Sequence, residues 1–178
     1  MSAASAGLGQ GATFTVSLPL MIMHPPASAP GQREQPRTDR DAASMETVPR
    51  LDGVHVLAVD DEADSLELLR TVLEGAGASV TTARSGAEAL HAMKERRPDV
   101  MIADVGMPGM DGLQLIRTVR QMEEPIRSIP AAALTAYARS QDRITSLASG
   151  FQMHLVKPID PLELVVAASS LAPKRPVG

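Results

Sequence analysis

Four strand-like segments of this 178-residue chain end in polar side chains of types that take part in phosphoryl chemistry. The residues are Asp60 and Asp61 after the first segment, Asp104 after the second, Thr135 after the third and Lys157 after the fourth. Carboxylates bind hard cations or act as nucleophiles, a lysine offers a positive charge to an anionic oxygen, and a hydroxyl donates a hydrogen bond. This set of residue types suits phosphoryl transfer, which depends mainly on positioning and on neutralisation of charge.

Asp104 occupies the most informative of these positions. The apolar run from Val100 to Ala103 ends in this carboxylate, and a turn rich in Gly and Pro follows it. A short apolar run bounded by turn residues is typical of a buried parallel strand. In open α/β sheets, ligands bind at the carboxyl ends of such strands. We therefore expect Asp104 to be a nucleophile that accepts a phosphoryl group.

The elements that must position these residues alternate regularly from residue 54 onward. Strands are predicted over residues 54–59, 79–83, 100–104, 130–135 and 151–156, and a segment with helical spacing follows each of them. Ser85, Asp111 and Asp160 are suited to cap three of these helices. Five strand–helix alternations favour a parallel, helix-covered α/β sheet with right-handed crossovers. All four polar strand ends then lie on one edge of the sheet and converge.

Converging carboxylates need a cation. Each pair among Asp60, Asp61 and Asp104 would repel by about 4 kcal/mol at a separation of about 4 Å and an effective dielectric near 20. Hard oxygen ligands without cysteine favour Mg²⁺, with one or two carboxylates bound directly and waters completing the octahedron. Lys157 and the Thr135 hydroxyl are then expected to contact phosphoryl oxygens.

These motifs resemble those of the receiver domain of two-component response regulators, the CheY-like family. The resemblance covers Val54 to Leu171 and rests on Val59-Asp-Asp-Glu62, Asp104-Val-Gly-Met-Pro-Gly-Met-Asp-Gly112, Ala133-Leu-Thr-Ala136 and Lys157-Pro158. It implies a flavodoxin-like sheet in the order 2-1-3-4-5, flanked by five helices. It also implies that a histidine kinase or a histidine phosphotransfer protein phosphorylates Asp104.

The same resemblance assigns further roles. Mg²⁺ would be held by Asp61, Asp104 and the Gly106 backbone carbonyl, with Asp60 acting through water. Thr135 would act as part of a conformational switch, together with the residue three positions before the lysine. The peptide bond between Lys157 and Pro158 is often cis in the family.

One position departs from the family's commonest pattern, and two others lie where the family tunes its chemistry. His154 stands where Tyr or Phe is usual at the switch, and histidine packs differently and ionises near neutral pH. Gly106 and Tyr137 flank the site where the family tunes hydrolysis. Gly106 has no side chain to orient water, and Tyr137 is bulky enough to screen the acyl phosphate. We expect a long-lived phosphoaspartate.

The amino-terminal third of the sequence does not continue the strand–helix alternation. Residues 7–20 resemble the last glycine box and closing strand of the ATP-binding domain of sensor histidine kinases, through Gly7, Gly9, Gly11 and the strand-like Ala12–Leu20. The other nucleotide-binding boxes of that family are missing. We predict a remnant of such a domain over residues 1–20, a largely disordered linker over 21–53, the receiver over 54–172 and a tail over 173–178.

The amino-acid composition argues against several classes of function. The net charge is −4 without a basic patch, which argues against direct binding of nucleic acid. The apolar fraction of 44% allows a core, while the aromatic fraction of 2% leaves it to aliphatic side chains and Met. The chain has no cysteine, and its apolar segment at 18–23 is too short to span a membrane. We expect a cytoplasmic protein without a membrane partner.

Three functions remain open at this point. The first is a signalling receiver that only accepts phosphoryl groups and is no enzyme beyond its own phosphorylation and dephosphorylation, encoded alone or as the end of a hybrid histidine kinase. The second is an aspartyl-phosphate hydrolase, although Gly106 stands where that class carries a general acid. The third is an intact ATP-dependent kinase, which would need the missing nucleotide boxes.

Overall fold

The computed structural model describes residues 2–5, 12–15, 49–136 and 139–173. The chain divides into two compact units, residues 1–42 and 43–178. In the first unit, β1 (Ser2–Ser5) pairs with β2 (Ala12–Thr15) in antiparallel register. A strand beginning at Ala12 was predicted, whereas β1 was not, because its Ser and Ala side chains carry no apolar alternation. The glycines at 7, 9 and 11 and residues 16–20 lie outside the described residues.

The second unit contains a parallel sheet in the order β4-β3-β5-β6-β7, which confirms the predicted order 2-1-3-4-5. Its strands are β3 (His55–Val59), β4 (Ser79–Ala83), β5 (Val100–Asp104), β6 (Ala131–Thr135) and β7 (Met153–Val156). Five helices alternate with them: α1 (Ala63–Gly75), α2 (Gly86–Glu95), α3 (Gly112–Gln121), α4 (Ser140–Ser149) and α5 (Pro161–Leu171). The predicted α/β class is therefore correct.

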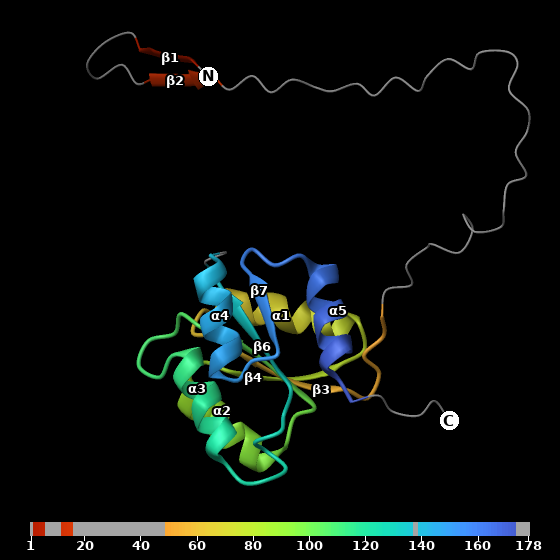
Figure 1. Ribbon diagram of the computed structural model, residues 1–178. Helices are drawn as coiled ribbons and strands as arrows, with labels where there is room; N and C mark the ends of the chain where they lie inside the picture. Colours follow the sequence, from red (N-terminus) through yellow and green to blue (C-terminus); the bar gives the residue numbers. More distant parts are fainter. Residues whose placement is uncertain (1, 6–11, 16–48, 137–138, 174–178) are drawn as a thin grey trace, which may run out of the picture. The chain divides into compact units, whose positions relative to one another are not determined.

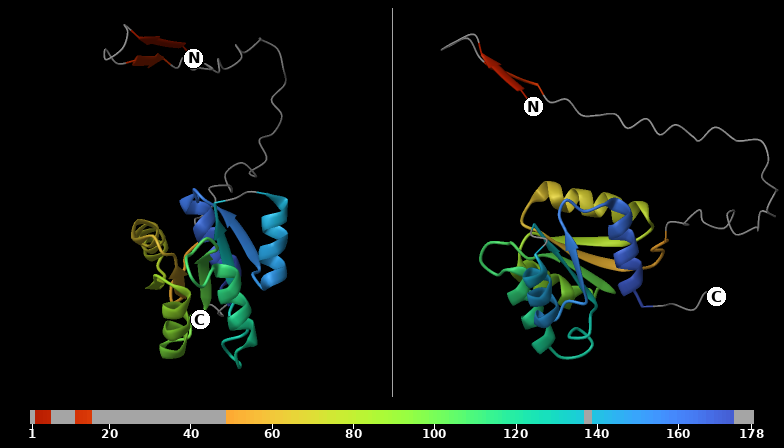
Figure 2. Two further views of the ribbon diagram at one scale, coloured as in Figure 1. Left: turned by 90° about the vertical axis from the view of Figure 1, so that its left-hand side faces the viewer. Right: turned by 45° about the horizontal axis from the view of Figure 1, so that its top comes forward.

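Helices cover both faces of the sheet (Figures 1 and 2). Helices α1 and α5 pack on one face, over a core that includes Val56, Ile102 and Leu134. Helices α2 and α3 pack on the other face, over a core that includes Met101 and Ala133, and α4 lies beside α3. Because β3, β5 and β6 are buried on both faces, their sequences are continuously apolar up to the residues at their ends.

The boundary of the folded domain differs from the prediction. Residues 49–53 were assigned to a disordered linker, yet Leu51 is 1% exposed and its amide donates a hydrogen bond to the carbonyl of Ala76. A single apolar residue between charged neighbours carries no periodicity, so sequence inspection passed over it. The folded domain therefore begins before residue 54.

Helix α4 buries little apolar surface and is therefore weakly anchored. Its buried residues are Ser146 and Ser149, whereas Ile144 and Leu147 are 58% and 39% exposed. The Ser149 hydroxyl accepts a hydrogen bond from Arg117 of α3 at 3.0 Å. Polar contacts thus take part in holding this helix to its neighbour.

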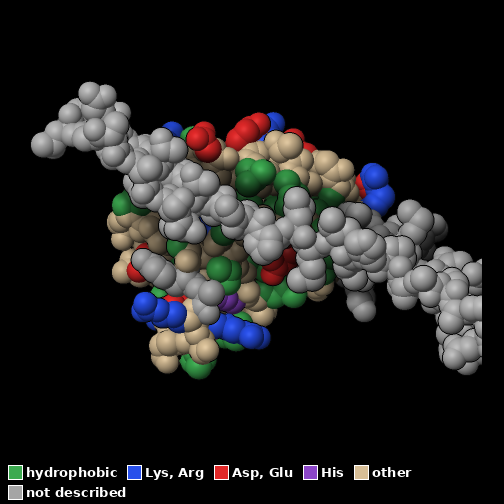
Figure 3. All heavy atoms as spheres, turned by 90° about the horizontal axis from the view of Figure 1, so that it is seen from above, with side chains coloured by type: hydrophobic (Ala, Val, Ile, Leu, Met, Phe, Trp, Pro, Cys, Tyr) green, Lys and Arg blue, Asp and Glu red, His purple; other side chains and the backbone are tan. Residues whose placement is uncertain are grey.

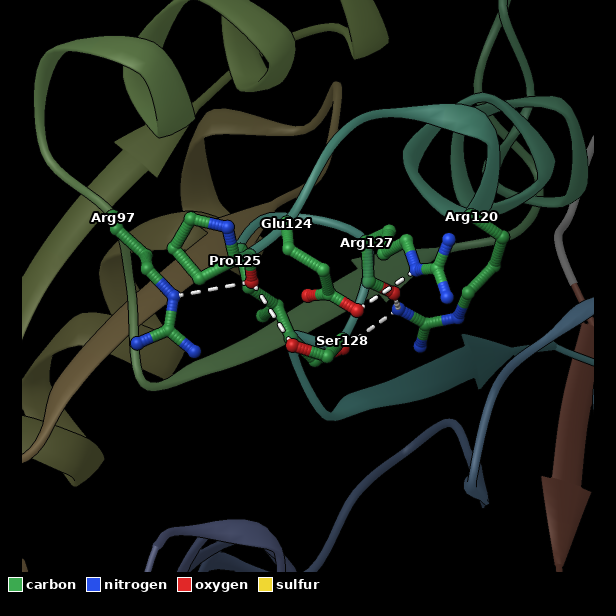
Figure 4. A network of polar contacts seen from close by, with 7 residues as sticks. Arg97, Arg120, Glu124, Pro125, Arg127 and Ser128 are labelled. Atoms are coloured by element: carbon green, nitrogen blue, oxygen red, sulfur yellow. Dashed lines mark hydrogen bonds and ion pairs between the residues drawn. The ribbon is translucent and has the colours of Figure 1, made fainter.

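A polar network ties the loops at the amino edge of the sheet (Figure 4). Arg120, at the end of α3, donates to the carbonyls of Arg127, Ile129 and Gly150 at 2.6–3.0 Å, and to Gln152 Oε1. Beside it, Arg97 and Ser128 both donate to the carbonyl of Pro125. The network fixes the loops that lead into β6 and β7.

The peptide bond between Lys157 and Pro158 is cis, in agreement with the family expectation, and so is the bond between Glu124 and Pro125. Within the described ranges, none of the helices has the length and the apolar character needed to cross a membrane.

Candidate functional site

The polar residues predicted at the strand ends meet in one cavity of about 400 Å³ at the carboxyl edge of the sheet. Its lining consists of Asp60, Asp61, Glu62, Asp104, Val105, Gly106, Thr135, Ala136 and Lys157. Strands β3, β5, β6 and β7 each deliver part of this set, because parallel strands all end on the same edge. The structure therefore brings together every predicted site residue except His154.

Asp104 is held by contacts on both carboxylate oxygens. The Gly106 amide donates to Oδ2 at 2.6 Å, and the Lys157 ammonium contacts Oδ1 at 2.7 Å. The side chain is buried, with 6% of the residue exposed. These contacts orient the carboxylate in the cavity, and a carboxylate is a group that can act as a nucleophile.

Lys157 is shared between two carboxylates, since its ammonium also lies 2.6 Å from Asp60 Oδ2. Burial acts to lower the pKa of Lys157, but hydrogen bonds and charges from Asp104 and Asp60 raise it by more, so the pKa lies above its usual value. The lysine is therefore a permanent cation at ordinary pH.

Asp60 is fully buried and accepts three hydrogen bonds. The Glu62 amide donates to Oδ1 at 3.0 Å, while the Ser65 hydroxyl and Lys157 both donate to Oδ2 at 2.6 Å. A buried carboxylate needs such donors, because it has lost its hydration. Asp60 is thus a structural acceptor whose oxygens are already engaged.

Asp61 differs from its neighbour. It is partly exposed, and its carboxylate makes no hydrogen bond or ion pair with any residue that the structure describes. It faces the same cavity as Asp104, where two further carboxylates share one lysine. The net negative charge of this set is neutralised when a divalent cation binds.

The donor set fits Mg²⁺ better than a metal held mainly by side chains. Among the described residues, no group of three or more His, Cys, Asp or Glu side chains is arranged to hold a metal ion. Mg²⁺ keeps several waters and needs only one or two carboxylates. Asp61 and Asp104 both line the cavity, which has a volume of about 400 Å³, so the residues present fit that requirement.

The turn after Asp104 is shaped by Asp111 and Gly112. The Asp111 side chain caps α3 by accepting from the Gln114 amide at 2.7 Å, as predicted. A Cβ at position 112 would collide with the backbone carbonyl of Asp104. This glycine therefore allows α3 to start close against the backbone of Asp104.

His154 lies outside the cavity that contains Asp104. It sits on β7 in register with Ala133 and lines a separate cavity of about 390 Å³ with Arg143, Glu163 and Val166. Its Nε2 is buried and is the only such side-chain atom in the described part of the chain without a hydrogen-bond partner. Tyr137, the other residue expected to tune the site, is outside the described residues.

On the part of the surface that Figure 3 leaves uncovered, Lys and Arg side chains occur in several groups, and Asp and Glu side chains lie among them.

Sequence inspection missed one residue of the site, Ser65. Its position in the first turn of α1 directs the side chain back toward the end of β3. The sequence does show a hydroxyl residue five positions after Asp60. That spacing indicates a contact with Asp60 only when the shape of the turn between β3 and α1 is known.

Comparison with known proteins gives consistent matches. A family model described as the response regulator receiver domain matches residues 56–169. An uncharacterised 14.6 kDa protein of Leptolyngbya boryana is 46% identical over 121 residues, which cover 68% of this chain and 89% of that protein. The sensor protein EvgS of Escherichia coli K12 is 33% identical over 151 residues, which cover 85% of this chain and 11% of EvgS.

Among solved structures, the chemotaxis response regulator CheY4 of Vibrio cholerae superposes with a TM-score of 0.62 at 34% identity. The match covers 66% of this chain and 98% of CheY4. The chain spans half the length of several other curated relatives that it matches.

Proposed function

This chain belongs to the response regulator receiver family of two-component signalling, and we propose that it accepts a phosphoryl group from a phosphohistidine on Asp104. One observation supports the proposal above the others: a lysine ammonium lies between Asp104 and the buried Asp60, in a cavity that the Asp61 carboxylate also lines. With three aspartate carboxylates and one lysine, such a site carries a net formal negative charge that a divalent cation would balance.

The chemistry follows from the chain's own residues. A carboxylate oxygen of Asp104 attacks phosphorus, the P–O bond forms as the P–N bond of the phosphohistidine breaks, and the imidazole leaves with the bonding electron pair. Lys157 turns toward a phosphoryl oxygen, and the Thr135 hydroxyl donates to another. Asp61, Asp104 and the Gly106 carbonyl would hold Mg²⁺, which would supply positive charge to the transferring group. Asp60, whose oxygens already accept hydrogen bonds, would not be a direct ligand.

The response to phosphorylation involves Thr135 and His154, which stand on neighbouring strands and on the same face of the sheet. We expect Thr135 to move toward the phosphoryl group and the His154 ring to follow. Its unpartnered Nε2 supports this role, because a buried nitrogen without a hydrogen bond makes the present ring position costly. The signal then reaches α4, whose anchoring is weak.

The phosphodonor protein docks beside Asp104, on a mostly apolar surface formed by α1 and the loop after β7. A cavity of about 280 Å³ there is lined by Leu68, Pro158 and Ile159, and it shares Glu62 and Lys157 with the cavity around Asp104. Leu68 is 52% exposed. A kinase or phosphotransfer protein that covers this surface brings its histidine close to the acceptor.

Leu68→Glu tests this docking surface. We expect phosphoryl transfer from a phosphohistidine protein to slow by about tenfold, because the variant places a charge where an apolar contact forms. Phosphorylation by acetyl phosphate, a small donor that needs no docking surface, stays within twofold of wild type. Equal slowing with both donors would contradict the assignment.

Residues 1–20 derive, in this proposal, from the ATP-binding domain of a hybrid histidine kinase, followed by a linker and the receiver. The match to the sensor protein EvgS extends beyond the receiver segment, since its 151 residues exceed those that the family model covers. We do not extend the proposal to ATP binding, because the other nucleotide-binding boxes of histidine kinases are missing from this sequence. A cytoplasmic location remains a prediction.

The function is tested by incubating the protein with acetyl phosphate and Mg²⁺ and measuring its intact mass. We expect the wild type to gain one phosphoryl group, about 80 Da, and Asp104→Asn to gain none. Asp142→Asn, at a partly exposed position on α4, is the matched control and behaves as wild type. An adduct on Asp104→Asn would contradict the proposal.

The same measurement gives the lifetime of the adduct after the donor is removed. We expect a long-lived phosphoaspartate, because Gly106 has no side chain that can orient a water beside Asp104 Oδ2. Loss of the adduct within seconds would contradict this expectation.

A further inference from the structure

Ser65 contacts the phosphoacceptor site through Asp60. Its hydroxyl donates to Asp60 Oδ2 at 2.6 Å, and Lys157 donates to the same oxygen at the same distance. Asp60 is 0% exposed, so its oxygens depend on donors within the site. One oxygen thus has two donors, of which one belongs to helix α1 and the other to the long side chain of Lys157.

The Lys157 ammonium cannot contact Asp60, Asp104 and a phosphoryl group at the same time. In the present state it contacts Asp60 Oδ2 and Asp104 Oδ1. When Asp104 carries a phosphoryl group, the new dianionic oxygens compete for the ammonium. Lys157 then leaves Asp60, and the buried Oδ2 depends on whatever donor remains.

We propose that Ser65 is a positioning residue that satisfies Asp60 while Lys157 turns to the phosphoryl group. The proposal rests on the proposed function of Asp104. Ser65 does not touch the reacting atoms. It keeps Asp60 hydrogen-bonded in both positions of the lysine and so lowers the cost of releasing Lys157.

The local structure explains why a serine can do this. Asp60 ends β3, the Glu62 amide binds Asp60 Oδ1, and α1 starts at Ala63, so Ser65 lies in the first helical turn. Side chains in a helix lean toward its amino terminus, which directs the Ser65 hydroxyl at the end of the strand. The short side chain reaches Oδ2 without displacing the lysine.

The test compares binding of beryllium trifluoride, a phosphoryl analogue, with binding of Mg²⁺ alone, both by isothermal titration calorimetry on the full chain. For Ser65→Ala we expect affinity for beryllium trifluoride, measured with saturating Mg²⁺, to fall about tenfold. Affinity for Mg²⁺ alone changes less than twofold, because Lys157 still satisfies Asp60 in that state. Ser65→Thr, which keeps the hydroxyl, restores analogue binding.

The matched control is Ser170→Ala, which removes a hydroxyl that donates only to the carbonyl of Val166 on α5. It binds both ligands as wild type. Wild-type affinity of Ser65→Ala for the analogue would overturn the proposal, and so would an equal loss of affinity for Mg²⁺, which indicates a structural role. If the wild type itself bound no analogue, the proposed function would fail instead.

Discussion

The two edges of the sheet hold charged side chains in opposite ways. At the amino edge, Arg120 is a half-buried cation whose partners are neutral oxygens, chiefly the carbonyls of Arg127, Ile129 and Gly150. At the carboxyl edge, Asp60 and Asp104 share one lysine, and Asp61 lines the same cavity. Burial lowers the pKa of Arg120, whereas at Lys157 the effect of burial is outweighed by two carboxylates, so that its pKa is raised.

This difference separates a structural site from a reactive one. Backbone carbonyls cannot leave the Arg120 guanidinium without unfolding the loops that carry them, so its contacts are permanent. The contacts of Lys157 are made with side chains and leave negative charge uncompensated. A ligand that brings positive charge, or a phosphoryl group that attracts the lysine, can therefore rearrange the carboxyl edge while the amino edge stays fixed.

The largest effect is expected when the cation that Asp60 and Asp104 share, the Lys157 ammonium, is removed. Lys157→Met should lower the rate of phosphorylation by acetyl phosphate by about 100-fold, since one charged group that stabilises the transferring oxygens is lost. Affinity for Mg²⁺ should rise in the same variant, because a competing positive charge has left the cavity. Calorimetry checks the second point, and weaker Mg²⁺ binding would contradict the account.

The matching change at the amino edge is Arg120→Ala. It leaves three backbone carbonyls with fewer donors, and we expect the free energy of unfolding to fall by about 2–3 kcal/mol. Urea denaturation measures this loss. The phosphorylation rate of the folded fraction stays within twofold of wild type, and a tenfold slower rate would show that the two edges are not independent.

A smaller effect is expected at His154. Replacing it by Phe removes the buried nitrogen that has no partner and keeps an aromatic ring, so the free energy of unfolding should rise by about 1 kcal/mol. His154→Gln, which keeps buried polar atoms, serves as the comparison in the same urea titration. A destabilised Phe variant would mean that the ring nitrogen is satisfied in solution.

The smallest effect concerns pH. The pKa of Lys157 is raised in the folded state, so the unfolded chain, with a lysine pKa near 10.4, releases the proton first as the pH rises. The stability that Lys157 contributes is fully present below about pH 10 and is lost as the pH passes through the folded-state pKa. The difference in unfolding free energy between wild type and Lys157→Met should therefore shrink above that pH. A difference in unfolding free energy that stays constant above that pH would contradict the raised pKa of Lys157.

Much of this architecture could be predicted from the sequence, because the same apolar runs that identify the strands also identify the polar residues at their ends. The apolar run that ends at Asp104 defines both a buried strand and the position of its terminal carboxylate. The same reasoning located Thr135 and Lys157, and Asp111 was identified as a cap from turn chemistry.

The remainder depends on contacts between distant segments. Leu51 shows no periodicity, and its burial depends on the core it joins beside Ala76, the residue that follows α1. Ser65 and the five hydrogen bonds of Arg120 depend on side-chain direction and loop shape, which spacing does not encode. Likewise, a histidine at position 154 suggested a switch, but only the packing shows that its Nε2 is buried without a partner.

The central claim is that Asp104 carries the phosphoryl group and that Mg²⁺ is needed to place it there. Borohydride reduces an acyl phosphate to an alcohol, so peptide mapping after treatment with acetyl phosphate and borohydride identifies the modified residue. The account predicts homoserine at position 104 when Mg²⁺ is present and unmodified aspartate when it is chelated. Homoserine at Asp60 or Asp61, or equal modification of Asp104 without Mg²⁺, would contradict it.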